Sequence, residues 1–157
     1  MSIQVTLKAT EPTTVAFIPR MGSYSQIPQT MTQLMRWVTA NGYRAEGPPS
    51  GVYFNNPMVT PEAELTWEIR VPLAGKPREL SPSGGVGIKT VSAGEIAAAI
   101  HRGPYAQVGN TYQELGRWLG EQGYRVAGPA EEVYLSDPST TPEAELMTEI
   151  RMPVAKA

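Results

Sequence analysis

The chain has 157 residues, a formal net charge of −2 at pH 7 and no cysteine. This length fits one compact unit or two small modules that share a core, and the missing cysteine excludes disulfides, thiol nucleophiles and thiolate metal sites. The sequence has no run rich in lysine or arginine, no signal-peptide pattern and no apolar run of membrane-spanning length. We therefore expect a cytoplasmic protein that binds neither nucleic acid directly nor a membrane.

The first half of the chain predicts strands around one helix. Residues 3–8 alternate apolar and polar side chains, which is typical of a half-buried strand, and residues 14–20 predict a second strand. Apolar residues then recur at three- and four-residue steps from 26 to 41, which predicts an amphipathic helix. Gly42 suits the left-handed residue that often ends a helix. Two further strands are predicted at 51–55 and 64–72.

The second half repeats this plan after a predicted linker at 74–85. It predicts strands at 86–91, 96–101, 132–136 and 145–153, and a helix at 107–122 that ends at Gly123. Residues 15–75 align without a gap with residues 96–156, and nearly half of the paired positions are identical. We therefore predict a single α+β domain over 1–157, built from tandem strand-helix-strand-strand modules at 1–73 and 86–157. Each module would have an antiparallel sheet and one long helix, with a pseudo-twofold axis relating them, and the seam between such modules is a natural ligand site.

Alternation along the last strand of each module predicts two chemically different faces. In the first module Leu65, Trp67 and Ile69 share the face expected to receive the helix, and Glu68 and Arg70 share the other. We expect the polar face to include one tyrosine in each module, which gives the sets Tyr53, Glu68 and Arg70, and Tyr134, Glu149 and Arg151. Aromatic rings beside a carboxylate suit a cationic or polarised organic ligand. The alternative is an exposed ion pair on a solvated sheet, which would contribute little to stability.

The remaining aromatic residues and the single histidine give weaker evidence about function. Trp37 and Trp118 hold equivalent helical positions, where packing against the sheet is expected rather than ligand contact. Tyr24 and Tyr105 precede the helices, where they would either close the mouth of a cleft or anchor a loop. His101 is the only histidine, and we expect it on the surface. One histidine without cysteine makes zinc binding and a Ser-His-Asp triad improbable, and we expect no metal and no cofactor.

The order of motifs in the second repeat is similar to that of a known family. The motif residues are the Gly103-Pro104-Tyr105 turn, Trp118, Gly123-Tyr124, Gly128-Pro129, Val133-Tyr134 and Glu149-Ile150-x-x-Pro153, and the first repeat has corresponding features. This pattern resembles the GyrI-like small-molecule-binding superfamily, which includes effector-binding domains of AraC-type and MerR-type transcription regulators.

The resemblance implies two modules with a cleft that binds amphipathic, often cationic or aromatic, compounds, as in multidrug binding. The family's typical glutamate corresponds to Glu149 and, by repeat symmetry, to Glu68. We expect ligand contacts from Tyr53, Glu68, Tyr134 and Glu149, with Tyr24, Tyr105 and Trp67 as further contacts.

Three functions follow from the resemblance. A stand-alone sensor or sequestering protein for small hydrophobic or amphipathic molecules is favoured. The second is a hydrolase of reactive cyclopropane-containing, DNA-alkylating metabolites, with Glu149 or Glu68 as the catalytic carboxylate. The third is a protein-binding inhibitor of the DNA gyrase type. Residues before position 15 leave no room for a helix-turn-helix, so we expect any role in transcription regulation to require a separate regulator chain.

Overall fold

The computed structural model describes residues 3–82 and 85–157, which form two compact units. The α1 unit is Glu11–Ala93, and the α2 unit joins Met1–Thr10 to Gly94–Ala157. Each unit combines an antiparallel sheet with one long helix, which confirms the predicted α+β fold. Residues 1 and 2, and residues 83 and 84 of the predicted linker, lie outside the described residues.

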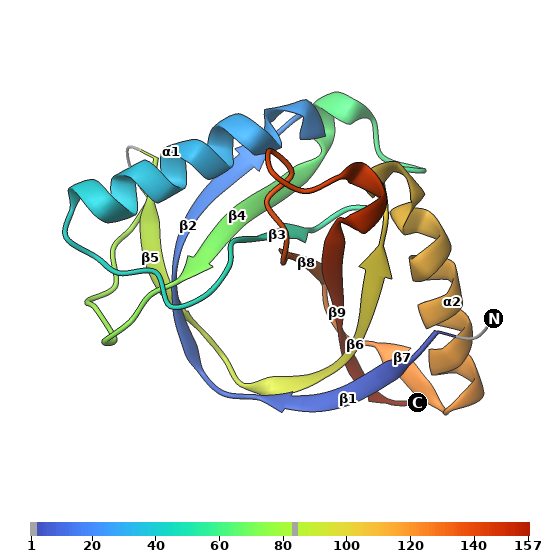
Figure 1. Cartoon of the computed structure of the whole chain (residues 1–157). Helices are drawn as coiled ribbons and strands as arrows, with labels where there is room; N and C mark the ends of the chain where they lie inside the picture. The colour runs from blue at the N-terminus through green and yellow to red at the C-terminus, as the bar shows by residue number, and fades with distance from the viewer. Residues whose placement is uncertain (1–2, 83–84) are drawn as a thin grey trace. The chain divides into compact units, whose positions relative to one another are not determined.

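The α1 unit has its strands in the order β3-β4-β2-β5, all antiparallel (Figure 1). Its elements are β2 (Thr13–Met21), η1 (Tyr24–Gln26), α1 (Ile27–Ala40), β3 (Ser50–Tyr53), η2 (Glu62–Glu64), β4 (Thr66–Pro72) and β5 (Gly87–Val91). Gly42 follows α1 with φ of 78°, which confirms the predicted left-handed residue.

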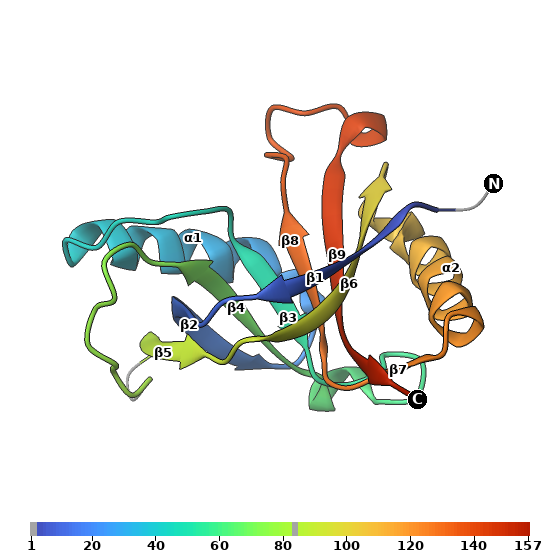
Figure 2. The same ribbon diagram turned by 90° about the horizontal axis from the view of Figure 1, so that it is seen from below.

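The α2 unit has its strands in the order β1-β6-β9-β8, and β7 also pairs with β9 (Figure 2). Its elements are β1 (Val5–Thr10), β6 (Gly94–Arg102), η3 (Tyr105–Gln107), α2 (Val108–Glu121), β7 (Tyr124–Val126), β8 (Ala130–Tyr134), η4 (Glu143–Glu145) and β9 (Met147–Lys156). β7 and the four short 3-10 helices of the described residues were not predicted from the sequence.

The leading strand of each repeat pairs within the unit of the other repeat. β1 precedes β2 in the chain but pairs with β6, and β5 precedes β6 but pairs with β2. The compact units therefore differ in extent from the modules predicted at 1–73 and 86–157. Hydrophobic alternation identifies a strand, but it does not identify the neighbouring strand.

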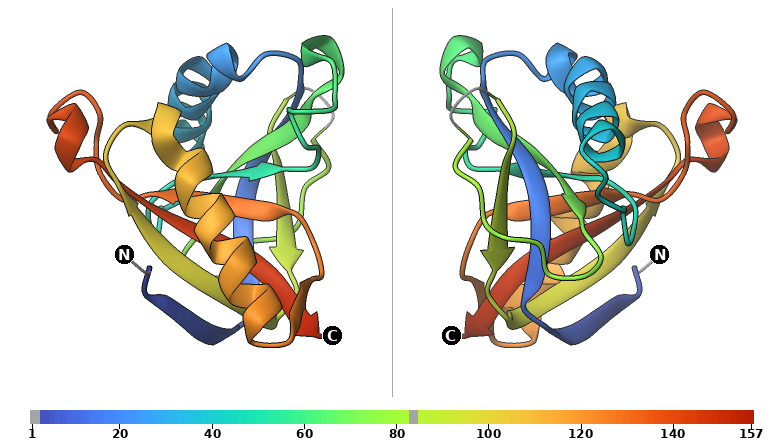
Figure 3. Two further views of the ribbon diagram at one scale, coloured as in Figure 1. Left: turned by 90° about the vertical axis from the view of Figure 1, so that its right-hand side faces the viewer. Right: turned by 90° about the vertical axis from the view of Figure 1, so that its left-hand side faces the viewer.

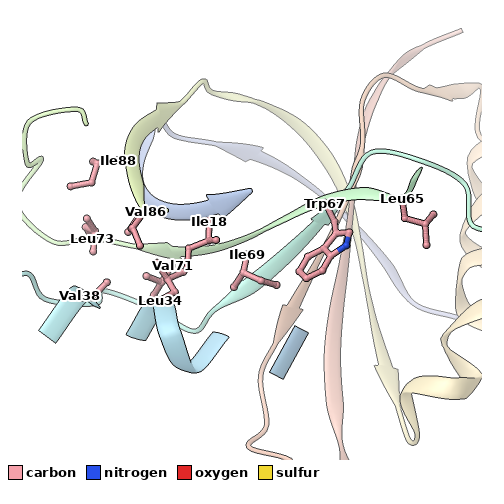
Figure 4. Packing of buried hydrophobic residues seen from close by; sticks show 11 residues of the cluster. Ile18, Leu34, Val38, Leu65, Trp67, Ile69, Val71, Leu73, Val86 and Ile88 are labelled. Atoms are coloured by element: carbon pink, nitrogen blue, oxygen red, sulfur yellow. The ribbon is translucent and has the colours of Figure 1, made fainter. Parts of the chain in front are cut away.

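In the α1 unit the core lies between α1 and one face of the sheet. Trp67, Ile69 and Val71 alternate along β4 and point to the side on which Leu34 and Val38 of α1 lie (Figure 4). Leu34 and Val38 are one helical turn apart, so a single stripe of the helix is buried. This packing confirms the predicted helix-facing side of β4.

The α2 unit repeats this packing with its own residues. Leu115 and Leu119 of α2 pack against Ala97, Ile150 and Val154, and Figure 3 shows α2 lying across the face of this sheet. The helical tryptophans are also equivalent, because Trp37 stacks on Tyr43 and Trp118 stacks on Tyr124. Both tryptophans pack against the core between helix and sheet, as predicted, and the absence of ligand contact stays a prediction.

We predict that truncation of the buried leucine near the middle of each long helix destabilises the two units to a similar degree. Leu34→Ala and Leu115→Ala remove fully buried leucines, so each should lower the free energy of unfolding by about 2–5 kcal/mol in urea denaturation. Met58→Ala is the control, since Met58 is 87% exposed. A change below about 0.5 kcal/mol in either leucine variant would contradict the repeated core.

Candidate functional site

In the α1 unit one carboxylate is held by two cations. Glu68 of β4 is only 4% exposed, and its Oε2 accepts a hydrogen bond from Arg70 Nε at 2.5 Å. Lys89 of β5 lies 2.8 Å from the same oxygen and donates to Oε1 at 3.0 Å. The Lys89 ammonium also lies 4.1 Å from the centre of the Phe17 ring, a cation–π contact.

The α2 unit has an equivalent group. Glu149 Oε1 accepts from Arg151 Nε at 2.5 Å, and Oε2 accepts from Lys8 Nζ at 3.1 Å. We call each set of one glutamate, one arginine and one lysine an ion triad. The lysines come from the leading strands β1 and β5, so each triad joins an edge strand to the strand that ends a repeat, β9 or β4.

Sequence reasoning found the glutamates and arginines of the triads but missed both lysines. A signal was present, because the repeat alignment extends back to place Lys8 on Lys89. What was missing was the strand pairing that brings each lysine to its glutamate.

Each triad carries one more positive than negative charge. Burial raises the pKa of Glu149, but hydrogen bonds from Arg151 and Lys8 outweigh it, and the net effect holds this pKa below its ordinary value. Glu149 is therefore ionised at neutral pH and is a weak proton acceptor. An incoming cation would have to compete with a lysine and an arginine already in place.

The tyrosines predicted beside these glutamates lie on the opposite face. In the register of β3 and β4, Tyr53 is directly opposite Trp67, and Val52 is opposite Glu68. Directly opposed residues share a face, so Tyr53 lies on the helix side with Trp67. The expectation that Tyr53 and Glu68 share a face is wrong. Alternation shows which residues of one strand share a face. Which face of the neighbouring strand lies beside them depends on the turn that joins the two strands.

The second repeat shows the same register. Tyr134 is opposite Thr148, and Val133 is opposite Glu149. The predicted grouping of Tyr134 with Glu149 is therefore wrong for the same reason.

Instead, the predicted aromatic residues meet one another on the helix side. Tyr24 contacts Tyr53 and Trp67 edge-to-face, with ring centroids 5.2 Å and 6.2 Å apart. The Trp67 indole is 1% exposed and donates to the Gly22 carbonyl at 3.0 Å, so it packs as a core residue that also holds the loop before α1. In the α2 unit Tyr105 and Tyr134 form the equivalent edge-to-face pair at 5.8 Å.

A second carboxylate in the α2 unit was missed by the sequence analysis. Glu132 of β8 accepts a hydrogen bond from the Tyr112 hydroxyl of α2 at 2.7 Å. Burial raises its pKa, and the Tyr112 hydrogen bond and the nearby His101 only partly oppose that effect. The sequence held a weak signal, since Glu132 replaces Gly51 of the first repeat.

His101 is buried, at 5% exposed, so the expected surface position is wrong. Its Nε2 lies 3.0 Å from the Pro104 carbonyl, which can only accept, and its Nδ1 lies 2.8 Å from the Thr111 hydroxyl. In the first repeat Arg20 makes the corresponding contact to Thr30. Each residue therefore joins its strand to the first turns of the helix, and His101 also contacts the loop at Pro104.

Within residues 3–82 and 85–157, no helix is long and apolar enough to span a membrane. The same part of the chain has no group of three or more histidine, aspartate or glutamate side chains placed to hold a metal ion.

We predict that Glu149→Gln destabilises the fold in a pH-dependent way. A pKa lowered by folding means that the charged form contributes stability above the unfolded pKa, and this contribution is lost as the pH falls through the folded pKa. At pH 7 the variant should lose about 1 kcal/mol of unfolding free energy, since Lys8 and Arg151 are partly exposed. Denaturation of both proteins at pH 7 and pH 3 tests this, with the exposed Glu143→Gln as control. An unchanged difference between the two pH values would contradict the prediction.

Comparisons with known proteins agree with this architecture. The C-terminal domain of EcmrR is similar in fold at 21% identity and a TM-score of 0.84, over the whole length of both chains. The chain spans 58% of the EcmrR chain in its DNA complex and covers 98% of its own length there, with 22% identity and a TM-score of 0.82.

Two further structures share the fold at lower identity. A hydrolase from Listeria innocua matches at 15% identity and a TM-score of 0.70, over 98% of this chain and 93% of that one. SAV2435 bound to tetraphenylphosphonium matches at 14% identity and a TM-score of 0.58, over 98% and 94% of the two chains.

A search of curated proteins found no match. The model of the GyrI-like small molecule binding domain matches residues 4–155. The chain therefore belongs to the GyrI-like small-molecule-binding domain family.

Proposed function

We propose that this protein binds small hydrophobic or amphipathic molecules and acts as a sensor or a sequestering protein. The observation that carries the proposal is the family match over residues 4–155. A structure of the same fold that holds tetraphenylphosphonium, an amphipathic organic cation, supports this ligand class. Action through a separate regulator chain or on DNA gyrase stays a prediction.

The aromatic residues on the helix side are the proposed ligand contacts. Tyr105 and Tyr134 meet edge-to-face, and the position equivalent to Trp67 is Thr148, whereas in the α1 unit Tyr24 contacts both Tyr53 and the buried Trp67. Apolar ligands favour such aromatic walls with a few polar groups. We therefore assign ligand contact first to Tyr105 and Tyr134 and assign Trp67 to the core.

Glu68 and Glu149 were predicted to contact a ligand that could be cationic, but their ion pairs favour a different ligand charge. Each ion triad has surplus positive charge, so its face suits a neutral or anionic part of a ligand better than a cation. The prediction that these residues line a cleft stays a prediction.

A panel of four dyes or ions tests the proposal. Rhodamine 6G and tetraphenylphosphonium are cations, Nile red is neutral, and 8-anilinonaphthalene-1-sulfonate is an anion. We expect at least one compound to bind saturably and raise the melting temperature, because a ligand that binds only the folded state stabilises it. Quenching of the three tryptophans provides a second readout for the dyes. Neither saturation nor a thermal shift with any of the four would contradict small-molecule binding.

Hydrolysis is the second candidate, and Glu132 is the observation that favours it. A carboxyl whose pKa is raised by burial can take and release a proton closer to neutral pH than an ordinary glutamate. Glu149 suits this role less, because its ion pairs keep it charged.

Mass spectrometry after incubation with a reactive cyclopropane compound separates the two candidates. A binder returns the compound unchanged, whereas a hydrolase adds the mass of one water. Loss of turnover in Glu132→Gln but not in Glu149→Gln would assign the reaction to Glu132.

A further inference from the structure

The leading strands β1 and β5 occupy equivalent positions in their units. In the two registers Leu7 lies opposite Ala97, and Ile88 lies opposite Ala16. The repeat alignment, extended back along the chain, places Leu7 on Ile88 in the same way as it places Ala16 on Ala97. The backbone of β1 therefore has the same orientation toward β6 as the backbone of β5 has toward β2.

The outer edge of β5 is covered by the residues that precede it. Ile88 N donates to the Leu80 carbonyl at 2.8 Å, and Leu80 N donates to the Ile88 carbonyl at 2.9 Å. Two residues further along β5, Thr90 N donates to the Glu79 carboxylate at 3.0 Å. Alternate residues of an antiparallel strand direct their backbone groups to the same side. Ile88 and Thr90 are thus the residues whose backbone groups face away from β2.

The outer edge of β1 is open. By equivalence with β5, the residues whose backbone groups face away from β6 are Val5, Leu7 and Ala9. Within residues 3–82 and 85–157, β1 pairs with β6 alone and ends the order of strands (Figure 1). Leu7 is 40% exposed, whereas its equivalent Ile88 is 2% exposed. One repeat therefore buries the central residue of its leading strand, and the other leaves a leucine beside an open strand edge.

The usual protections of an open edge are weak in β1. Soluble proteins guard such edges with outward lysines, prolines or bulges. β1 has no proline, and its register with β6 runs without interruption from Val5 to Thr10. Its one lysine, Lys8, is held by Glu149 of its own sheet at 3.1 Å. This edge is therefore suited to accept another strand.

The sequence of β1 is complementary to itself in antiparallel orientation. Val5 packs against the core under α2, so Val5, Leu7 and Ala9 share the helix side. A twofold axis at Leu7 pairs Leu7 with the Leu7 of a second copy, and Val5 with the second copy's Ala9. This register aligns the outward backbone groups and the apolar side chains together. It also places Lys8 opposite Thr6, so that no like charges are directly opposed.

We propose that two copies of this chain associate by antiparallel pairing of β1 with β1, which joins the sheets of the two α2 units across a twofold axis. Such an interface is isologous, because each copy contributes the same residues. Backbone hydrogen bonds at Val5, Leu7 and Ala9 fix the register, and the two Leu7 side chains form an apolar contact. β5 cannot pair in this way, because Glu79 and Leu80 already occupy its edge. The inference is independent of the proposed small-molecule function.

Sedimentation velocity of the full chain tests the proposal at protein concentrations up to about 0.5 mM, above the dissociation constants of ordinary specific complexes. We expect wild type to shift from monomer to dimer as the concentration rises. Leu7→Lys should stay monomeric, because two lysines would be directly opposed at the axis. It should remain folded, since Leu7 is exposed. Leu135→Lys is the matched control, because it makes the same change at a leucine outside β1 that is 43% exposed.

Amide hydrogen exchange of wild type gives a second readout that needs no variant. Dimerisation through β1 should slow exchange at Leu7 and Ala9 as the protein concentration rises, because their N–H groups enter the new pairing. Thr6 and Lys8 should change little, because their N–H groups face β6 in the monomer and in the dimer.

The outcomes decide the proposal in either direction. A concentration-dependent dimer that is lost in Leu7→Lys and kept in Leu135→Lys supports β1 pairing. Wild type that stays monomeric over the whole range overturns it, and so does a dimer that persists in Leu7→Lys. If both variants dissociate, the exchange data decide. Selective protection of Leu7 and Ala9 then supports β1 pairing, and its absence overturns it.

Discussion

The register between the last two strands of each repeat determines the chemistry of the protein. Because Tyr53 pairs with Trp67 and Tyr134 with Thr148, the tyrosines lie on the helix side and the glutamates Glu68 and Glu149 on the other. A shift by one residue would bring every tyrosine beside a triad glutamate and carry the triads under the helices. Aromatic packing and ion pairing are thus separated onto two faces of each sheet.

The ion triads explain how a carboxylate is kept in a nearly water-free place. Removing a glutamate from water costs several kcal/mol, and a single ion pair often fails to recover that cost. Glu68 has two cations within hydrogen-bond distance, and one of them, Lys89, also lies over the Phe17 ring. Since Lys89 and Lys8 come from the leading strands, each triad also favours the pairing of these strands with the unit in which they are found.

Much of the fold could be predicted from the sequence, because duplication makes each pattern appear twice. The helices, the glycines after them, and the burial of Leu34 and Leu115 follow from local periodicity and were found as expected. The strand partners could not be found in this way, because pairing between β1 and β6 is a long-range choice that alternation does not encode. The placement of Tyr53 and Glu68 on opposite faces of the sheet was missed for a related reason, since it depends on the turn between their strands.

For the proposed ligand contacts, the motifs that the repeats share and the positions at which they differ point to different residues. Positions that are identical in the two repeats, such as Trp37 and Trp118, indicate packing, and each of these tryptophans stacks on an equivalent tyrosine. The motif glutamates Glu68 and Glu149 are also shared, and both are held by ion pairs. Glu132 has no counterpart carboxylate, because Gly51 holds the equivalent position, and its hydrogen bond comes from the Tyr112 hydroxyl.

Duplication offers a physical reason for this asymmetry. A region that must both pack a core and hold a polar ligand faces opposing demands, because polar groups without partners destabilise a core. Trp67 in the first repeat is fully buried with its N–H satisfied, so that copy meets the packing demand. The second copy carries Thr148 with an unsatisfied hydroxyl and Glu132 with a pKa raised by burial, and both are costs to stability. Duplication thus allows one copy to carry these costs while the other copy keeps a fully packed tryptophan at the equivalent position.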